Sequence, residues 1–280
     1  MSSGLLLIDK EEGITSRKVD NLVGKRFMTQ KVGHLGTLDP FATGLLIVAV
    51  GKGTKYLTFL KDEEKTYEAC LKLGSKTSTG DNTSPVIEEK EVPVLEEGEV
   101  RNALLSFLGE SEQIPPMTSA KKINGVPLYK KAHKGLEVER KPIKINVYEA
   151  SLDDYNREEK LVFFTVKVSK GTYIRTLGED LAAKLGTVGH LIYLRRTAIG
   201  DISVEDAKSI DEAEFVNPMD LLRHYEIHAI SKEEVKDIKD GKPLIINAHD
   251  NEILIVNESE PLAIYKRQQN DLFVSERGLF

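Results

Sequence analysis

The amino-acid sequence predicts an α+β fold, with a mainly antiparallel mixed sheet flanked by helices and a small β-rich module at the C-terminal end. Strand-like and helix-like segments are mixed along most of the chain, without the regular strand–helix–strand alternation that builds a parallel sheet. The last part changes character, because short β-like runs separated by polar turns replace the longer segments. We therefore expect a main domain over residues 1–223 and a module over residues 224–280.

The N-terminal part predicts two strands and a helix joined by a loop. Gly4–Ile8 is a short apolar run typical of a buried strand. Thr15 or Ser16 can cap the helix that follows, whose apolar residues fall on one face. A loop rich in Gly, Thr, Asp and Pro covers Lys31–Gly44 and leads to Leu45–Val50, which we expect to be a strand buried on both faces.

The middle of the chain predicts three further strands and two helices. Thr66–Leu73 alternates apolar and polar residues, as a strand with one buried face does. Leu161–Val168 and Val188–Ile199 also have strand character. Val100–Leu108 and Thr176–Leu185 group their apolar residues at helical spacing.

The final segment predicts a small module that packs on the main domain. A short charged helix is expected over Ser231–Lys239. The β-like runs that follow are Pro243–Asn247, Glu252–Asn257, Pro261–Lys266 and the fragment Asp271–Val274. A unit of this size buries too little surface to be stable alone, so we expect it to dock on the rest of the chain.

The composition indicates a folded protein, and its net charge argues against nucleic-acid binding. The 39 Lys and Arg residues and 45 Asp and Glu residues leave a formal charge of −6. Phosphate backbones attract basic chains rather than acidic ones. Cys70 is the single cysteine, which excludes an intramolecular disulfide and a cysteine-based metal cluster. The lone thiol, the short apolar runs and the lack of a signal-peptide pattern predict a cytoplasmic protein with no membrane segment.

The charges are segregated along the chain, so the net value hides local surfaces. From Glu88 to Glu112 the acidic residues exceed the basic ones by six, and from Lys121 to Lys144 the basic residues exceed the acidic ones by six. The basic segment fits a phosphate-binding surface. The alternative is an ordinary solvated basic loop, and the charge counts alone do not separate the two.

Two short constellations carry residues suited to chemistry. In the segment Gly33–Gly44, Pro40 stiffens the backbone directly after Asp39, so an acid is held on a rigid loop between a helix and a buried strand. The alternative is an Asx turn. In the segment Lys170–Arg175, Arg175 can pair with a carboxylate and keep it ionised, or it can be an ordinary surface arginine at a helix start.

These segments resemble the bacterial tRNA pseudouridine-55 synthases. Gly33–Gly44 is similar to the family's Gly-His-x-Gly-x-Leu-Asp-Pro-x-Ala-x-Gly motif. Later family motifs match in order at Lys65-Thr66-Tyr67, Pro115-Pro116, Ser119-Ala120, Gly125, Leu128-Tyr129, Gly171–Arg175 and Leu194-Arg195-Arg196. The resemblance covers about residues 4–200, and ordered matches over such a span make chance unconvincing as an explanation. The C-terminal module is similar to a PUA-type RNA-binding module.

The resemblance implies a mixed α/β catalytic fold and isomerisation of a T-loop uridine of tRNA, without a cofactor or a metal. Asp39 falls on the catalytic aspartate, with Tyr67 and Arg175 on its active-site tyrosine and arginine. His34, Tyr173 and Leu194, together with Tyr67, fall on residues that contact the flipped nucleotide. An RNA-gripping insertion is implied at about residues 111–144. Its candidate RNA contacts are Lys121, Lys122, Lys130, Lys131 and Lys134.

The chemistry fits this implication but leaves alternatives open. The N-glycosidic bond of a uridine breaks and the base rejoins at C5, which needs a carboxylate as a nucleophile or as a base, and no redox cofactor. One rival is a pure RNA-binding module in which Asp39 is a structural turn residue. Another is a nucleoside hydrolase, for which two carboxylates around one bond are expected. The expected partner is the tRNA T-stem-loop, with no protein partner, and the expected state is a monomer.

Overall fold

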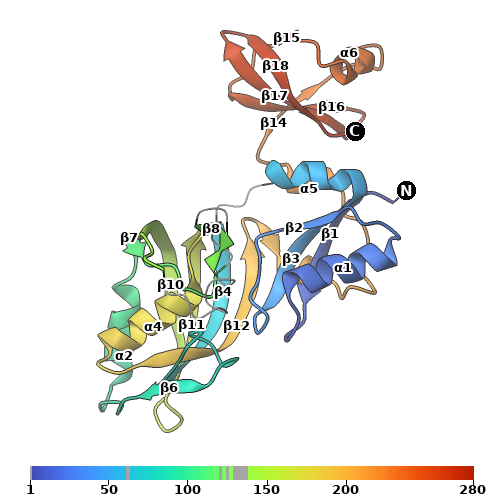
Figure 1. Cartoon of the computed structure of the whole chain (residues 1–280). Helices are drawn as coiled ribbons and strands as arrows, with labels where there is room; N and C mark the ends of the chain where they lie inside the picture. The colour runs from blue at the N-terminus through green and yellow to red at the C-terminus, as the bar shows by residue number, and fades with distance from the viewer. Residues whose placement is uncertain (1, 61–63, 120–121, 124–125, 129–137) are drawn as a thin grey trace.

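The computed structural model describes residues 2–60, 64–119, 122–123, 126–128 and 138–280. Within these residues it forms one nine-stranded sheet, one five-stranded sheet and two small hairpins. Figure 1 shows the five-stranded sheet, with α6, as a separate unit above the larger sheet. The larger sheet is antiparallel except where β12 pairs with β3, so the predicted α+β fold with a mainly antiparallel sheet is confirmed.

The large sheet runs in the order β1-β3-β12-β4-β11-β10-β7, with β2 beside β3 and β13 beside β12. Its strands are β1 (Gly4–Lys10), β2 (Val32–Leu35), β3 (Thr43–Val50), β4 (Glu64–Leu73), β7 (Gly109–Gln113), β10 (Ile143–Asn156), β11 (Leu161–Ser169), β12 (Gly189–Ile199) and β13 (Ile202–Ser203). The hairpins are β5 (Ser75–Thr77) with β6 (Val86–Glu89), and β8 (Lys122–Ile123) with β9 (Val126–Pro127).

One end of the sheet is built from β1, β2 and β3 and covered by α1 (Ser16–Arg26). Thr15 caps this helix, since its hydroxyl accepts a hydrogen bond from the backbone N–H of Lys18 at 3.0 Å. Val19 and Val23 on the inner face of the helix are fully buried. Every residue of β3 after Thr43 is buried, so side chains on both faces of the strand are covered. This confirms the expected two-sided burial of the strand.

The other half of the sheet packs against α2 (Glu97–Leu105) and α4 (Ile174–Lys184). In β11 alternate residues are buried, and in β4 Tyr67, Ala69 and Leu71 point into the same core as expected. Leu177 and Leu181 of α4 meet this face of the sheet. The core therefore forms between the sheet and its helices, as the alternating strands and periodic helices predict.

The C-terminal part forms its own sheet and shares a core with the main body. Its strands are β14 (Glu226–Ala229), β15 (Leu244–Ile245), β16 (Glu252–Asn257), β17 (Glu260–Gln269) and β18 (Leu272–Gly278), beside α6 (Val235–Lys239). Leu254 and Ile264 of this sheet are fully buried in one cluster with Leu5 and Leu45 of the main sheet. The module therefore docks through apolar contacts. The short elements η1 (Gly51–Thr58), η2 (Val204–Asp206) and α5 (Pro218–Leu221) lie in the connecting segments.

Several element predictions need correction. The expected loop Lys31–Gly44 contains β2, which is too short to show a strand pattern. The helix expected over Val100–Leu108 is α2, which begins earlier because Glu96 and Glu99 form a capping box. The helix expected over Ser231–Lys239 is reduced to α6. Strand β10 escaped prediction, since two bulges interrupt its alternation.

A close backbone approach joins the two halves of the sheet, where β3 meets β12. Gly44 has a φ of +102°, and a Cβ placed there would lie 2.3 Å from the carbonyl oxygen of Arg196. Only glycine fits a conformation of this kind against another backbone. The position of the segment between β2 and β3 therefore depends on Gly44.

We expect Gly44→Ala to lower the free energy of unfolding by about 2 kcal/mol or more, because strain and backbone overlap add. Urea unfolding measures the change. Gly98→Ala is the matched control, since nothing lies within 4 Å of a Cβ at that exposed helical position. A Gly44→Ala variant as stable as the Gly98→Ala control would contradict the importance of this approach.

Candidate active site

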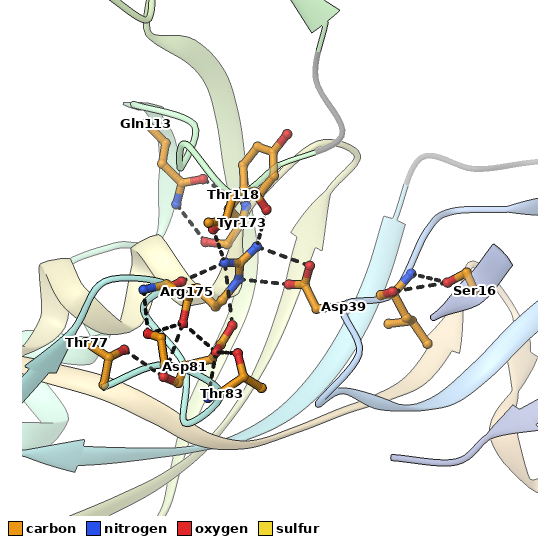
Figure 2. A network of polar contacts seen from close by, with 12 residues as sticks. Ser16, Asp39, Thr77, Asp81, Thr83, Gln113, Thr118, Tyr173 and Arg175 are labelled. Carbon is orange, nitrogen blue, oxygen red and sulfur yellow. Dashed lines mark hydrogen bonds and ion pairs between the residues drawn. The ribbon is translucent and has the colours of Figure 1, made fainter. Parts of the chain in front are cut away.

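The centre of the site is an ion pair between Asp39 and Arg175. The Arg175 Nε lies 2.8 Å from Asp39 Oδ2, and Arg175 Nη2 donates to Asp39 Oδ1 at 3.1 Å. Two parallel contacts of this kind fix the plane of the carboxylate as well as its position. The arginine side chain is 4% exposed, whereas the aspartate side chain is 33% exposed. Figure 2 shows the guanidinium of Arg175 meeting the carboxylate from one side, and the exposed fraction shows that the carboxylate remains accessible.

The remaining donors of Arg175 are occupied by the protein. Its Nη1 donates to the Thr79 carbonyl oxygen and to the Thr118 hydroxyl, both at 2.6 Å. Its Nη2 also donates to the Thr118 carbonyl oxygen at 3.2 Å, and Asp81 Oδ2 lies 3.6 Å from Nη1. A guanidinium offers five N–H donors in a fixed plane. Because all of them point at acceptors, the arginine has one orientation available.

A polar turn between β5 and β6 holds Asp81 behind the arginine. Asp81 Oδ1 accepts hydrogen bonds from the Thr79 hydroxyl at 2.6 Å and from the backbone N–H of Thr83 at 3.0 Å. The Thr77 hydroxyl donates to the Asp81 carbonyl oxygen at 2.6 Å. Sequence reasoning missed this turn. The signal that could have found it is the dense run of Thr and Ser around one aspartate in residues 77–84.

The loop that carries Asp39 is fixed on both sides of the carboxylate. The Ser16 hydroxyl makes two hydrogen bonds to the backbone of Leu38. It accepts one from the Leu38 N–H at 2.9 Å and donates one to the Leu38 carbonyl oxygen at 3.1 Å. Arg196, which is fully buried, donates from Nη2 to the Gly36 carbonyl oxygen at 2.8 Å. Residues from α1 and β12 therefore set the backbone just before Asp39.

Lys10 fixes the backbone just after Asp39. Its ammonium group is fully buried and donates to the carbonyl oxygens of Glu11 and Ile14 at 2.8 Å and of Pro40 at 3.2 Å. Burial lowers its pKa to about 8, and the negative charge of Asp39 opposes that shift. A buried cation close to Asp39 adds to the positive potential around the carboxylate. Lys10 is a second residue of the site that sequence reasoning missed.

Two opposing influences act on the pKa of Asp39. The surrounding protein, the larger influence, raises the pKa above its ordinary value of 3.8, because it displaces the water that stabilises a charged carboxylate. The Arg175 guanidinium lowers this pKa, and the Asp81 carboxylate raises it. A titratable group perturbed by burial beside a specific charge partner, at the wall of a pocket, is typical of a functional site.

A pocket of about 270 Å³ opens beside the carboxylate. Asp39 and Arg175 line it together with Tyr67, Tyr173 and Leu194, so the structure brings five of the expected residues into one place. Tyr67 and Leu194 are almost buried and come from the paired strands β4 and β12. An aromatic ring and an apolar side chain around a carboxylate suit a flat ring that carries polar edges.

Two further residues shape this pocket: Gln113, which nothing in the sequence identifies, and Ser119, which belongs to a matching motif but for which no role is predicted. The Gln113 side chain holds the main chain at Tyr173: its Oε1 accepts from the Tyr173 N–H at 2.8 Å and its Nε2 donates to the Tyr173 carbonyl oxygen at 3.0 Å. Ser119 lines the pocket at 2% exposure, and its hydroxyl has no hydrogen-bond partner within the described part of the chain. A buried hydroxyl at a pocket wall is suited to meet a polar ligand.

His34 lies outside the pocket lining and is held by a buried acid. Its Nδ1 is 3.0 Å from both carboxylate oxygens of Asp20, and its Nε2 is 3.1 Å from the hydroxyl of Thr37. Thr37 does line the pocket. The expected nucleotide contact at His34 is thus adjacent to the pocket rather than part of its wall. Asp20 fixes the imidazole ring of His34, and nothing in the sequence except its position on α1 identifies it as part of the site.

The candidate RNA-contact lysines fall largely outside the described residues. Lys121, Lys130, Lys131 and Lys134 lie there, and Lys122 is described only as part of the backbone of β8. Within the described residues, no group of three His, Cys, Asp or Glu side chains is arranged to hold a metal ion. In the same residues, no helix is long and apolar enough to cross a membrane.

We expect Arg175→Gln to raise the pKa of Asp39 further, because the substitution removes the charge that favours the ionised form. Carbon-13 NMR of the Asp39 carboxyl group measures the titration. Arg195→Gln is the control, since Arg195 pairs with Asp9 at 2.7 Å and does not contact Asp39. An Asp39 pKa that stays unchanged in Arg175→Gln would show that the arginine is not its electrostatic partner.

Comparison with known proteins assigns the chain to a family. A model for the N-terminal domain of the TruB family of pseudouridylate synthases matches residues 25–174. The tRNA pseudouridine synthase B of Hydrogenovibrio crunogenus is 39% identical over 98% of this chain and 89% of its own length. The tRNA pseudouridine synthase B of Aquifex aeolicus is 41% identical over 90% of each chain.

A solved structure supports the fold independently of close sequence similarity. One chain in the crystal structure of a Cbf5-Nop10-Gar1 complex superposes with a TM-score of 0.74, covering 99% of this chain and 85% of that one at 22% identity. At that identity the likeness shows a shared fold. The family model and the two relatives, each matched over most of its length, lead to one conclusion: the chain belongs to the TruB family of pseudouridylate synthases.

Proposed function

We propose that the protein isomerises a T-loop uridine of tRNA to pseudouridine, with Asp39 as the catalytic carboxylate. The observation that carries the proposal is the Asp39 carboxylate, which is clamped by Arg175 at 2.8 Å and exposed to a pocket with Tyr67. Family membership and the names of the relatives support the reaction and the tRNA substrate. The T-loop as target rests on the resemblance of the motifs around Asp39.

The shape of the site supports base flipping. The pocket beside Asp39 is small and walled by side chains from β4, β12 and the start of α4, so a base stacked within an RNA loop must leave its stack to enter. Tyr67 offers a ring on which the base stacks, and Tyr173 and Leu194 bound it. In this proposal His34 fills the position that the base vacates, and its contact with Asp20 next to the pocket supports that role.

The chemistry assigned to each group follows from its contacts. Arg175 keeps the Asp39 carboxylate ionised and aims it at C1′ of the ribose or at a proton of the sugar, according to the nucleophilic or the glycal route. Both routes release the base, let it turn and rejoin it at C5. The C5 proton then leaves to Tyr67 or to a water molecule. Every step conserves the redox state, so none of them requires a redox cofactor.

The pocket favours isomerisation over hydrolysis. A glycosidase-type site places two carboxylates around the scissile bond. Among the described residues that line the pocket, Asp39 supplies the only carboxylate, while Asp81 lies behind Arg175 with its side chain 5% exposed. The neighbouring acid therefore acts on the arginine rather than on the substrate.

The remaining sequence expectations complete the proposal. Residues 1–223 form the catalytic domain, and residues 224–280 form a PUA-like module that docks on it. The segment at about residues 111–144 grips RNA through its lysines. The enzyme acts as a monomer on the T-stem-loop. The separate five-stranded sheet and its shared core with the main body support this division.

We expect Asp39→Asn to abolish turnover while RNA affinity stays largely unchanged, because the substitution keeps the shape but removes the reacting charge. Tritium release from tRNA carrying 5-tritiated uridine measures turnover, and filter binding measures affinity. Near wild-type tritium release from the variant would remove Asp39 from the mechanism. Asp153→Asn, which alters an exposed aspartate on β10, is the matched control.

Asp81→Asn tests the support behind the arginine. We expect kcat to fall by about tenfold or more while KM changes little, because Asp81 holds Arg175 without lining the pocket. Steady-state tritium release over a range of RNA concentrations separates the two constants. A rise in KM at constant kcat would instead indicate that Asp81 takes part in binding RNA.

A further inference from the structure

A second and larger hollow lies along α1, outside the catalytic pocket. It has a volume of about 760 Å³ and is lined by α1 and by the segment that leads from α1 into β2. Three of its lining residues, Arg17, Lys18 and Lys25, are basic and exposed. The one acid among the described lining residues is Asp20, which is 3% exposed and contacts both His34 and Arg17, so basic residues outnumber acids in the lining by three to one. This groove is therefore positively charged within a chain whose net charge is negative.

The positive surface continues past the end of the groove. Gln30 and Val32 line the groove, and Lys31 between them is exposed. The backbone N–H of Gly51 donates to the Lys31 carbonyl oxygen at 2.8 Å. The next residue in the chain, the exposed Lys52, therefore lies close to Lys31. The β2–β3 pairing that ends at Val32 thus connects the groove to the start of η1.

The positive surface then reaches the C-terminal module. Lys55 of η1 donates to the Phe280 carbonyl oxygen at 2.6 Å, and exposed Arg277 lies on β18 of the same module. The pKa of Lys55 is lowered by partial burial and by the positive charges of Lys31, Arg277 and Lys52. Cations from separate elements are therefore near enough to repel one another, an arrangement that an anionic partner relieves.

The other end of this surface meets the catalytic pocket. Asp20 lines the α1 groove and contacts His34, and His34 contacts Thr37, which lines the pocket. Strand β3 runs from the pocket end at Thr43 to the η1 end at Val50. From Thr43 to Val50 the extended chain rises about 23 Å, so the basic residues extend well beyond one flipped nucleotide.

We propose that these residues form a basic track that binds the sugar–phosphate backbone of the substrate RNA outside the catalytic pocket. The track comprises Arg17, Lys18, Lys25, Lys31, Lys52, Lys55 and Arg277. The inference rests on the proposed function, because the pocket at one end fixes where the RNA begins. A row of cations along a groove matches a row of phosphates. Among the described lining residues, Met28 is the one large apolar side chain that is strongly exposed, at 92%, so the groove offers a folded protein partner no extended apolar surface.

The test replaces four lysines of the track, Lys18, Lys25, Lys31 and Lys52, by Gln in one variant of the full chain. All four side chains are exposed, so the fold is retained, and circular dichroism verifies this. We expect affinity for unmodified tRNA at moderate salt to fall at least tenfold. We also expect the slope of log affinity against log salt to become shallower by about two to four, since each lost phosphate contact removes roughly 0.9. The kcat at saturating tRNA should stay at the wild-type value.

The control carries the same kind of charge change on another part of the surface. Lys90, Arg157, Lys160 and Lys184 are exposed basic residues of the main domain outside the track, and their combined change to Gln should leave affinity and salt slope close to wild type. Equal losses in both variants would overturn the track, because they would reflect net charge alone. Wild-type affinity and slope in the track variant would also overturn it.

The failure of the track and the failure of the proposed function are distinguishable. Active wild-type protein, together with a track variant that binds tRNA normally, rejects the track and leaves the function standing. Wild-type protein that binds tRNA but releases no tritium rejects the function, and the binding comparison still decides the track. Wild-type protein that fails to bind tRNA at any salt concentration rejects both.

Discussion

The ion pair between Asp39 and Arg175 is the interaction around which the site is arranged. A carboxylate partly removed from water is reactive only if it stays ionised and aimed, and a buried arginine is tolerated only if its donors are satisfied. The structure meets both conditions at once, because Thr79, Thr118 and Asp81 hold the arginine while Asp39 remains open to the pocket. The rest of the sheet brings these distant segments together.

The sequence predicts most of the fold and the main residues of the site, but it does not predict the residues that hold them by hydrogen bonds. The apolar periodicity of β4, β11 and α4 predicts the core, and the motifs predict Asp39, Tyr67 and Arg175 as neighbours. Strand β10 was not predicted, because two bulges interrupt the alternation of apolar and polar residues by which a strand is recognised in a sequence. The supporting contacts were also hidden, since hydrogen bonds such as that from Lys10 to Pro40 depend on tertiary structure rather than on spacing along the chain.

Charge acts locally in this protein. The net charge of −6 taken alone argues against RNA, yet α1, η1 and Lys31 between them gather basic residues beside the pocket, and the acid Asp20 is buried in polar contacts. Asp20 links the two features, because it fixes His34 at the pocket and also pairs with Arg17 of the groove. Catalytic geometry and RNA attraction are therefore supplied by adjoining parts of the same N-terminal elements.

The central claim is that the clamped Asp39 carboxylate isomerises one uridine in the T-loop of tRNA. Incubating the wild-type protein with unmodified tRNA and mapping the modified position tests it most directly. The account predicts pseudouridine at a single T-loop uridine, without release of free uracil. Release of uracil, modification spread over several loops, or tRNA that is bound but left unmodified would contradict it.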